Sequence, residues 1–380
     1  MRIAFNATGL LSPLTGIGQY SRHLAMGLAA FKGIDADFFY GAYWSKDVRS
    51  APLPVAASVL PWIRSNVPFS YELRRLVQTQ RFKAHARPER FDIYHEPNIL
   101  PLPFDGLTVL TVHDLSWIRF PQLHPAVRVR AMNKYFEPGL KRAALILTDS
   151  EFVKRELMDV FGVRPELIVP VPLGVEPLFR PQLADETFPV LTRHGLQHRQ
   201  YLLAVGTLEP RKNLQLALHA FMQLPPAIRK NFPLVLVGMT GWHTSALEAQ
   251  MAPLIQSGEV RQLGYLSRTD LATVMAGALT LIFPSIYEGF GLPPLEAMAC
   301  GVPVIASDVS SMPEVVRDTG MLIDPHDPQG LAEAIEAMVT DSATREKLAQ
   351  KALVRSREFT WDRCVEQTIG AYLQVLPLHK

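Results

Sequence analysis

The sequence predicts a protein of the α/β class, with two consecutive domains that each contain a parallel sheet. Short apolar runs alternate with longer helical patterns along nearly the whole chain, an alternation typical of strand–helix–strand units. The length of 380 residues fits two domains better than one. The stretch Phe179–Pro189 is rich in proline and acidic residues and loses the apolar period, so we interpret it as the linker between the domains.

The predicted elements form two series. The first has strands at Ile3–Phe5, Ile93-Tyr94, Leu107–Val112 and Ala144–Thr148, with helices at Ile17–Phe31 and Phe152–Phe161. The second has strands at Tyr201–Gly206, Leu234–Val237, Val260–Leu263, Leu279–Phe283, Val302–Ala306 and Gly320–Ile323, with helices at Leu214–Met222, Arg268–Ala276, Pro293–Cys300, Pro328–Thr340 and Ser342–Arg357. We therefore expect domains at residues 1–182 and 190–357, and a C-terminal helix in residues 358–380 that packs back on the first domain.

Composition excludes several classes of protein. Lys and Arg total 38 against 36 Asp and Glu. The net charge of +2 lacks the basic excess that is typical of nucleic-acid-binding proteins. Only Cys300 and Cys364 are present, without metal-ligand spacing, which favours a reducing compartment. The N-terminus lacks the pattern of a signal peptide, and no run of about 18 apolar residues occurs. We expect a cytoplasmic protein, with the inner face of the cytoplasmic membrane as a possible contact.

The most informative stretch is 283–301, where a strand ends at Phe283 and a glycine-containing loop leads into a helix. Gly289 and Gly291 allow a ligand to approach the backbone closely, and free amides at the helix start can hold phosphate oxygens. Glu296 lies about one turn into the helix, where a carboxylate accepts hydrogen bonds from sugar or ribose hydroxyls. The alternative is a plain strand–helix turn, in which Glu296 only favours the helix.

A second stretch, 205–213, also follows a strand and opens a helix. Its adjacent cations Arg211 and Lys212 can neutralise a pyrophosphate, Arg through paired contacts and Lys as a mobile charge. In most proteins an adjacent Arg-Lys pair on a loop is exposed to solvent. Here the pair follows a strand, at the place where we expect the ligand-binding cleft.

These motifs resemble the family 4 retaining glycosyltransferases, which have the GT-B fold of two Rossmann-like domains facing a central cleft. Glu288 and Glu296 match the family's Glu–seven residues–Glu motif. The resemblance implies that Glu288 contacts the transferred sugar and that Glu296 binds the donor ribose. It also implies that the loop amides of Gly289, Phe290, Gly291 and Leu292 meet sugar and phosphate. The resemblance covers the whole second half and, more loosely, the first half.

Other stretches extend the resemblance. Tyr265 and Leu266 match the family's base-binding turn, although a simple turn with Ser267 as helix cap explains the stretch equally well. Gly16 and Gly18 resemble the first-strand glycine loop that approaches the donor phosphates. Many relatives have an Arg at the position of Thr207, directly after the glycine that ends the strand. Whether Arg211 takes over the role of that Arg stays open.

In the first half, His113 directly follows the Leu107–Val112 strand, and the resemblance places a His there, close to the transferred sugar. The alternative is a histidine with a structural role only. The stretch His95–Asn98 is a candidate wall of the acceptor site, and Ser150 is expected to cap a helix. Asp35-Ala36-Asp37 superficially resembles the metal-binding pair of the other major glycosyltransferase fold. We interpret it as a solvated turn and expect neither a metal nor a cofactor.

The stretch Arg64–Arg90 carries seven Arg and Lys residues against Glu72 and Glu89, with aromatic residues interleaved. Such a segment can lie on an anionic membrane surface or meet a lipid-pyrophosphate. An exposed basic helix is the equally good alternative.

The predicted activity is retaining transfer of a hexose from a nucleoside-diphosphate sugar to a glycan or polyprenyl-linked acceptor. By resemblance to bacterial mannosyl- and rhamnosyltransferases of O-antigen and exopolysaccharide assembly, we expect mannose or a deoxy-mannose from a GDP-sugar. Two alternatives stay open: a sugar-nucleotide epimerase of similar fold, and a non-catalytic subunit that only binds the nucleotide sugar. Paired carboxylates also occur in glycosidases, but both glutamates here flank a phosphate-type loop.

Overall fold

The computed structural model describes residues 1–12, 14–49 and 70–376. The chain forms two compact units. Unit 1 comprises Met1–Leu115, Val127–Leu173 and Trp361–Lys380, and unit 2 comprises Ser116–Ala126 and Gly174–Thr360. Both are mixed α/β units.

Unit 1 contains a seven-stranded sheet of order β3-β2-β1-β4-β5-β6-β7. Every neighbouring pair is parallel except β2 and β3, which are antiparallel. The strands are β1 (Arg2–Asn6), β2 (Asp35–Phe39), β3 (Trp44–Ser45), β4 (Ile93–Glu96), β5 (Leu107–Val112), β6 (Leu145–Thr148) and β7 (Ile168–Pro170). The strand runs predicted from the sequence in this half are all present, because their buried apolar residues suit a sheet covered on both faces.

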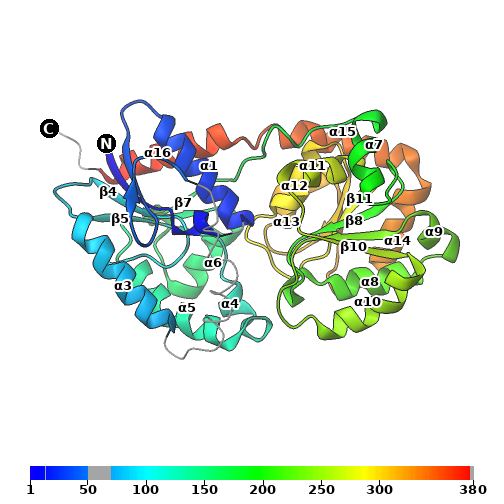
Figure 1. The fold of residues 1–380 in the computed structure, drawn as a ribbon, viewed down its shortest axis with the longest axis horizontal. Coiled ribbons are helices and arrows are strands. Elements are labelled where there is room, and N and C mark those ends of the chain that lie inside the picture. Colours follow the sequence, from blue (N-terminus) through cyan, green and yellow to red (C-terminus); the bar gives the residue numbers. More distant parts are fainter. Residues whose placement is uncertain (13, 50–69, 377–380) are drawn as a thin grey trace. The chain divides into compact units, whose positions relative to one another are not determined.

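The main helices of unit 1 are α1 (Gly16–Ala30), α3 (Ser70–His85), α5 (Ala126–Leu140), α6 (Glu151–Phe161) and α16 (Trp361–Val375). In Figure 1, α16 lies beside α1 although the two are at opposite ends of the chain. Trp361 stacks on His23 of α1, with ring centroids 4.4 Å apart. A Cβ at Gly27 would lie 2.4 Å from Val365, so glycine is what allows this close helix contact. The Tyr372 hydroxyl reaches the buried His95 Nδ1 at 2.5 Å.

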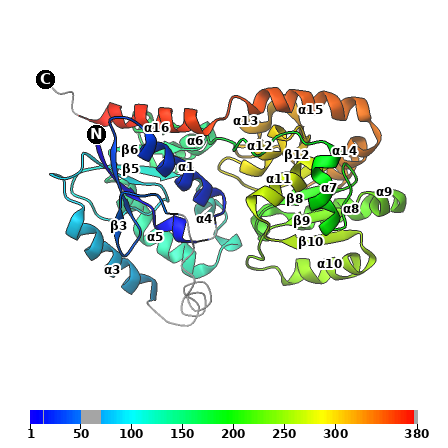
Figure 2. The same ribbon diagram turned by 45° about the horizontal axis from the view of Figure 1, so that its top comes forward.

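Unit 2 contains a six-stranded, all-parallel sheet of order β10-β9-β8-β11-β12-β13. Its strands are β8 (Leu202–Val205), β9 (Leu234–Val237), β10 (Val260–Gly264), β11 (Thr280–Phe283), β12 (Val304–Ser307) and β13 (Met321–Ile323). Figure 2 shows its helices, which are α7 (Ala184–Arg193), α8 (Leu214–Gln223), α9 (Pro226–Asn231), α10 (Ser245–Ser257), α11 (Arg268–Gly277), α12 (Leu292–Ala299), α13 (Met312–Val316), α14 (Pro328–Thr340) and α15 (Ser342–Ser356). The segment 116–126 adds α4 (Ser116–Arg119).

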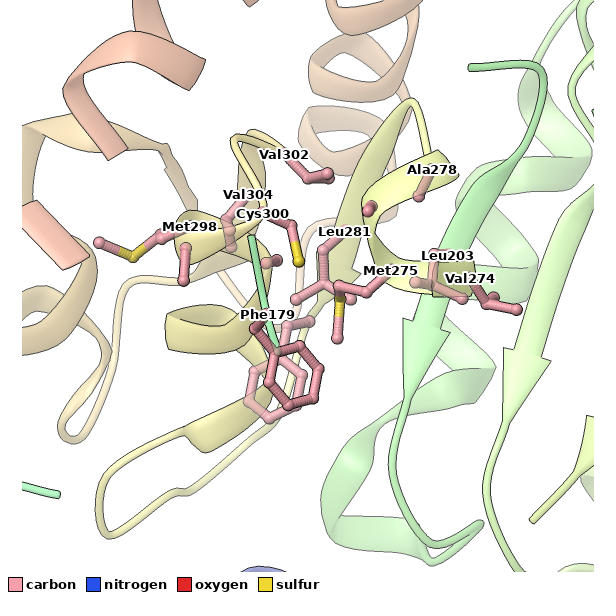
Figure 3. Close-up of a cluster of buried hydrophobic side chains, with 14 of the residues drawn as sticks. Phe179, Leu203, Val274, Met275, Ala278, Leu281, Met298, Cys300, Val302 and Val304 are labelled. Atoms are coloured by element: carbon pink, nitrogen blue, oxygen red, sulfur yellow. The ribbon is translucent and has the colours of Figure 1, made fainter. Parts of the chain in front are cut away.

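The core of unit 2 lies on both faces of its sheet. Alternate strand residues enter opposite clusters, so that Leu203 and Leu281 belong to one cluster while Leu202 and Ile282 belong to the other. Figure 3 shows part of the first cluster, in which Leu281 of β11 gathers with Met275 of α11 and other apolar side chains. This buried sheet fixes the ends of its strands, from which the loops of the candidate site begin.

The expected linker at Phe179–Pro189 is wrong. The chain passes from unit 1 into unit 2 between Leu173 and Gly174. Helix α7 begins at Ala184 and contains Pro189. Phe179 and Leu191 are buried in the core of unit 2, which explains why a proline-containing segment is ordered as a helix. Glu186 accepts a hydrogen bond from the Leu183 amide at 2.8 Å and caps the helix.

The interpretation of Asp35-Ala36-Asp37 as a solvated turn is also wrong, because all three residues belong to β2. Asp37 is buried and pairs with Lys46 at 2.5 Å and with His85 at 3.1 Å. Burial acts to raise the pKa of Asp37, but the hydrogen bonds from Lys46 and His85 outweigh it and lower the pKa. The Asp37 carboxylate is therefore occupied by ion pairs within unit 1.

Candidate active site

The two predicted cations of unit 2 stand where the β8 and β11 loops meet. Arg211 and Lys212 lie in the 3-10 turn Pro210–Lys212 after β8, and the Arg211 carbonyl accepts from the Ile286 amide of the β11 loop at 2.9 Å. Asn213 follows in the left-handed region, with φ of 54°. Its side-chain amide donates to the carbonyls of Pro284 and Pro325 at 3.1 and 2.8 Å. Asn213 thus ties together the loops that follow β8, β11 and β13.

Glu288 contacts both cations. Its carboxylate lies 2.6 Å from Lys212 Nζ and 3.0 Å from Arg211 Nη1. Burial alone would raise the pKa of Glu288, but the charges of Arg211 and Lys212 outweigh it and lower the pKa to about 2. Glu288 is therefore ionised throughout the physiological pH range.

A second acidic residue, Glu209, completes this cluster. Glu209 Oε1 lies 2.7 Å from Arg211 Nη2, and Arg211 Nη1 also donates to the Tyr287 carbonyl at 2.7 Å. Two cations and two carboxylates are thus packed together, with side chains no more than 14% exposed. Sequence reasoning missed Glu209, although its position two residues before Arg211 is a signal that could have identified it.

The glycine loop between Glu288 and α12 has one conformation that only glycine adopts readily. Gly291 caps α12 with φ of 101°, and a Cβ there would lie 2.3 Å from Met312 Cε. Ser311 donates to the carbonyls of Glu288 and Phe290, both at 3.0 Å. These contacts fix the loop 288–291 against α13, and its chain enters α12 at Leu292 with a proline in the first turn.

Glu296 lies on α12 in a second ion-pair cluster. Arg268, at the start of α11, donates to Glu296 at 2.9 Å and to Glu176 through its Nε at 2.8 Å. The guanidinium also stacks on the Phe179 ring, 4.5 Å from its centroid. Burial raises the pKa of Glu296, against the lowering effect of Arg268. Sequence reasoning missed Arg268 and Glu176, which are 92 residues apart and carry no local signal of their contact.

The predicted base-binding turn lies at the end of β10. Tyr265 is 53% exposed and Leu266 is partly buried. Ser267 accepts from the Asp270 amide at 3.1 Å and caps α11. The helix cap is therefore present, and it positions Arg268 at the first residue of the helix.

In unit 1, His113 is 5% exposed at the end of β5. Its Nδ1 lies 2.8 Å from Asp149 Oδ2, and its Nε2 lies 2.8 Å from the Pro97 carbonyl oxygen. Burial acts to lower the pKa of His113, but the charge and hydrogen bond of Asp149 outweigh it and raise the pKa. When both ring nitrogens donate, the imidazole carries a positive charge. Asp149 therefore favours the protonated, positively charged form of His113, and the Nε2 contact with the Pro97 carbonyl braces the 96–98 turn.

Gly16 and Gly18 form the first turn of α1, which begins one residue earlier than the sequence indicated. No side chain caps this helix start. A Cβ at Gly18 would meet Leu14 Cδ2 at 3.0 Å, so the glycine also serves local packing. Helix N-termini attract anions through their amides and the helix dipole.

Two family descriptions match the chain. Residues 14–177 match "Glycosyltransferase Family 4" and residues 193–355 match "Glycosyl transferases group 1". The chain is similar to the O-antigen chain mannosyltransferase B of Escherichia coli, with 37% identity over 98% of this chain and 99% of that protein. The chain belongs to glycosyltransferase family 4. It is a hexosyltransferase, as the resemblance in its glutamate motif implies.

Solved structures show the same fold. Sucrose-phosphate synthase from Thermosynechococcus elongatus is 22% identical, covers 98% of both chains and has a TM-score of 0.77. WaaG, a glycosyltransferase involved in lipopolysaccharide biosynthesis, is 19% identical over 99% of this chain and 100% of its own, with a TM-score of 0.75. The GT-B prediction is thereby confirmed.

Among the residues that the structure describes, no helix combines the length and apolar composition needed to cross a bilayer. The same residues contain no group of three or more His, Cys, Asp or Glu side chains placed to hold a metal ion.

Proposed function

We propose that this glycosyltransferase moves mannose, or a deoxy-mannose, from a GDP-sugar to a glycan or polyprenyl-linked acceptor in surface polysaccharide synthesis, with retention at the anomeric carbon. The observation that carries the proposal is the contact of Glu288 with Arg211 and Lys212 beside a glycine loop. A diphosphate and a hexose are the two ligand groups that such a cluster can bind together. The similarity to an O-antigen mannosyltransferase supports the sugar and the pathway.

The cations of the cluster would stabilise the leaving diphosphate. In this structure Arg211 and Lys212 are balanced by Glu209 and Glu288. Donor phosphates would take over part of the contact that Glu288 now makes, and the Glu288 carboxylate would turn to a hydroxyl of the hexose. Fixed buried charges stabilise developing charge more strongly than water does, because they need no reorganisation. The loop amides of Gly289, Phe290, Gly291 and Leu292 would add donors to the phosphates.

The remaining donor contacts follow from the second cluster. Glu296 would accept from the ribose hydroxyls, and the turn at Tyr265 and Leu266 would contact the base. Gly16 and Gly18, at the uncapped start of α1, would approach the phosphates. His113 would lie near the hexose and contribute positive charge.

We also propose peripheral contact with the cytoplasmic face of the membrane through α3. Leu73, Leu76 and Val77 are 63%, 56% and 39% exposed, and their spacing puts them on one face of the helix. Exposed Arg74 and Arg81 lie on the same helix. An apolar face with cations beside it suits an anionic bilayer surface. The basic stretch 64–90 falls partly outside the described residues, in 64–69.

The test is a sugar-nucleotide panel read by thermal shift, followed by transfer assays on octyl glycosides. A ligand that binds only the folded protein raises the unfolding temperature with its concentration. We expect GDP-mannose or a GDP-deoxy-mannose to give the largest shift, and the product to have the anomeric configuration of the donor by NMR. Inversion at the anomeric carbon, or conversion of the sugar nucleotide without any acceptor, would contradict the proposal. The second result would instead identify an epimerase.

A further inference from the structure

A chain of hydrogen bonds runs through the interior of unit 1 and links its last helix to its first. The Tyr372 hydroxyl of α16 lies 2.5 Å from His95 Nδ1 on β4. His95 Nε2 lies 2.8 Å from Thr111 Oγ1 on β5, and that oxygen lies 2.9 Å from the Tyr20 hydroxyl on α1. None of the four residues is more than 1% exposed. Buried polar groups are costly unless they are paired, and a paired network holds its side chains in one arrangement.

His95 couples the two halves of this chain. Burial lowers the pKa of His95 to about 3, and the charge of His113 acts in the same direction, so the His95 imidazole is neutral. A neutral imidazole has one donor nitrogen and one acceptor nitrogen. If Tyr372 donates to Nδ1, Thr111 must therefore accept from Nε2, and if Tyr372 accepts, Thr111 must donate. A change at Tyr372 is thus passed on to Thr111, because a buried nitrogen that loses its partner is costly and the side chains around it must adjust.

The other end of the chain lies against His113. The Tyr20 and His113 rings have centroids 5.0 Å apart and an angle of 81° between their planes, an arrangement that aromatic pairs favour. Asp149 and the Pro97 carbonyl contact the two ring nitrogens of His113, each at 2.8 Å. Tyr20 adds a contact through its ring, and the hydrogen bond between its hydroxyl and Thr111 fixes where that ring lies.

The place of the His113 ring matters because both of its nitrogens have partners within unit 1. A sugar hydroxyl could bind a ring nitrogen only by displacing Asp149 or the Pro97 carbonyl, so the charge of His113 is its means of acting on the hexose. The energy between two charges depends on their distance and is larger in buried surroundings than in water. A displacement of the ring would therefore change how strongly His113 stabilises the charge that develops in the transition state.

We propose that the four hydrogen-bonded side chains, from Tyr372 to Tyr20, form a positioning chain that holds the His113 ring in the place that turnover requires. A residue of the C-terminal helix thereby contributes to catalysis. Because Tyr372 is fully buried, it acts only through the positioning chain and not by contact with a substrate. The inference rests on the proposed function, which places His113 near the transferred hexose.

The first experiment observes His113 in the full chain without any substrate. In protein made with isotope-labelled histidine, the NMR signals of the His113 imidazole are identified by their loss in His113→Ala. Tyr372→Phe deletes one hydroxyl at the far end of the positioning chain and should shift those signals. Tyr201→Phe is the matched control, because Tyr201 is an equally buried tyrosine of unit 2 whose hydroxyl donates to the Val274 carbonyl. It should leave the His113 signals in place. Unmoved His113 signals in Tyr372→Phe would overturn the inference.

The second experiment measures turnover, with GDP-mannose as donor and octyl α-mannoside as acceptor probe. Tyr372→Phe should lower kcat about tenfold and leave both KM values within about twofold, because it disturbs a charge that acts in the transition state. Added to His113→Ala, it should cause no further loss of kcat, since residues that act as a unit are not additive. Tyr201→Phe should keep the wild-type kcat.

The double variant separates a positioning role from a purely structural one. Additive losses of kcat in His113→Ala with Tyr372→Phe would overturn the positioning chain and leave the proposed function intact. Wild-type kcat in His113→Ala alone would overturn the role of His113 in the proposed function, and with it the effect of the chain on turnover. Thermal unfolding checks that each variant folds. If Tyr372→Phe does not fold, Tyr20→Phe, which deletes the hydroxyl at the near end, decides the question by the same two measurements.

Discussion

At the scale of single residues, the two glutamates of the family motif differ in what surrounds them. Glu288 contacts two cations and has a pKa of about 2, whereas Glu296 shares one guanidinium with Glu176 and has a raised pKa. The first environment suits a group that must stay charged beside a reacting phosphate. The second suits a group that accepts from neutral ribose hydroxyls. The two environments therefore fit the division of roles that the proposed function gives to Glu288 and Glu296.

Replacing each glutamate should separate binding from turnover. A contact to the ribose is made in both the ground state and the transition state, so Glu296→Gln should mainly raise the donor KM. A contact to the reacting hexose orients the anomeric carbon, so Glu288→Gln should mainly lower kcat. Steady-state kinetics of both variants, with calorimetric binding of GDP, measures the difference. Loss of GDP affinity in Glu288→Gln with kcat retained would show that the hexose is misplaced.

Arg268 should set the pH range in which the donor binds. Removing this cation, as in Arg268→Met, should raise the pKa of Glu296 further, because burial is then opposed by no positive charge. Protonated Glu296 is a poorer acceptor, so donor affinity should fall as pH decreases, and at a higher pH than in the wild type. Glu176→Gln is the control. It should lower the pKa of Glu296 and move the loss of affinity to lower pH, because the charge of Glu176 raises that pKa. GDP binding against pH tests this, and identical midpoints in all three proteins would contradict it.

At the scale of elements, glycines allow the β8 and β9 loops to touch. Gly206 and Gly238 both have φ of 151°, and a Cβ at Gly238 would lie 1.9 Å from the Gly206 carbonyl oxygen. The Gly238 amide donates to the Gly264 carbonyl at 2.9 Å, which extends the contact to the end of β10. The loop that carries Arg211 and Lys212 begins at this contact, so its position depends on the absence of side chains there.

Gly238→Ala should therefore destabilise the fold and weaken donor binding together. We expect a loss of more than about 2 kcal/mol of unfolding free energy and a raised donor KM, because the added methyl displaces the 206–212 loop. Gly258→Ala is the matched control, with φ of 80° and no atom within 4 Å of the added Cβ. It should cost only about 1–2 kcal/mol and leave the kinetics unchanged. Urea unfolding and donor kinetics measure both effects, and equal losses in the two variants would refute the argument.

Strands of strong apolar pattern could be predicted from the sequence, whereas segments held by distant partners could not. Leu107–Val112 and Leu234–Val237 are β5 and β9 with the predicted bounds, because buried runs of β-branched and aliphatic residues are a local signal. Asp35-Ala36-Asp37 and Phe179–Pro189 failed because Lys46, His85 and the core of unit 2 decide their structure. The motif residues Glu288 and Glu296 were found by resemblance, but their partners Glu209, Arg268 and Glu176 required the fold.

At the scale of the whole molecule, the near balance of charge hides a local excess on α3. The protein should bind anionic vesicles more strongly than neutral ones, and salt should weaken that binding. Replacing Arg74 and Arg81 by Ser should weaken it about 30-fold, at about 1 kcal/mol for each cation. Arg75 is left unchanged because it is only partly exposed, in contact with the Tyr135 ring and the Pro101 carbonyl, whereas Arg74 and Arg81 are exposed.

The control for vesicle binding removes the same charge elsewhere. Lys347 and Arg357 are exposed cations of unit 2, and replacing both by Ser should leave vesicle binding unchanged. Co-sedimentation with vesicles of phosphatidylglycerol or phosphatidylcholine gives the measurement. Equal binding to both lipids, or equal weakening in both double variants, would remove the membrane contact from the proposal.

The charge of the donor site bears on whether catalysis needs a metal. A diphosphate leaving group carries negative charge that must be neutralised, and the proposed function gives this role to Arg211, Lys212 and the start of α12. Asp37, one of the two carboxylates that could resemble a metal-binding pair, is already paired with Lys46 and His85. The protein's own cations should therefore supply the stabilisation that a divalent ion supplies elsewhere.

Transfer should consequently survive chelation by EDTA, with kcat/KM within about twofold of the untreated protein, since the stabilising charges are side chains. Lys212→Ala should lower kcat/KM on the order of 10²–10³, because it removes one preorganised charge from the leaving group. EDTA should add nothing to that loss. The kinetics are measured for both proteins with EDTA and after addition of manganese. Complete loss of wild-type transfer in EDTA, restored by manganese, would show that a metal neutralises the diphosphate. Near wild-type turnover of Lys212→Ala would instead remove Lys212 from the donor site.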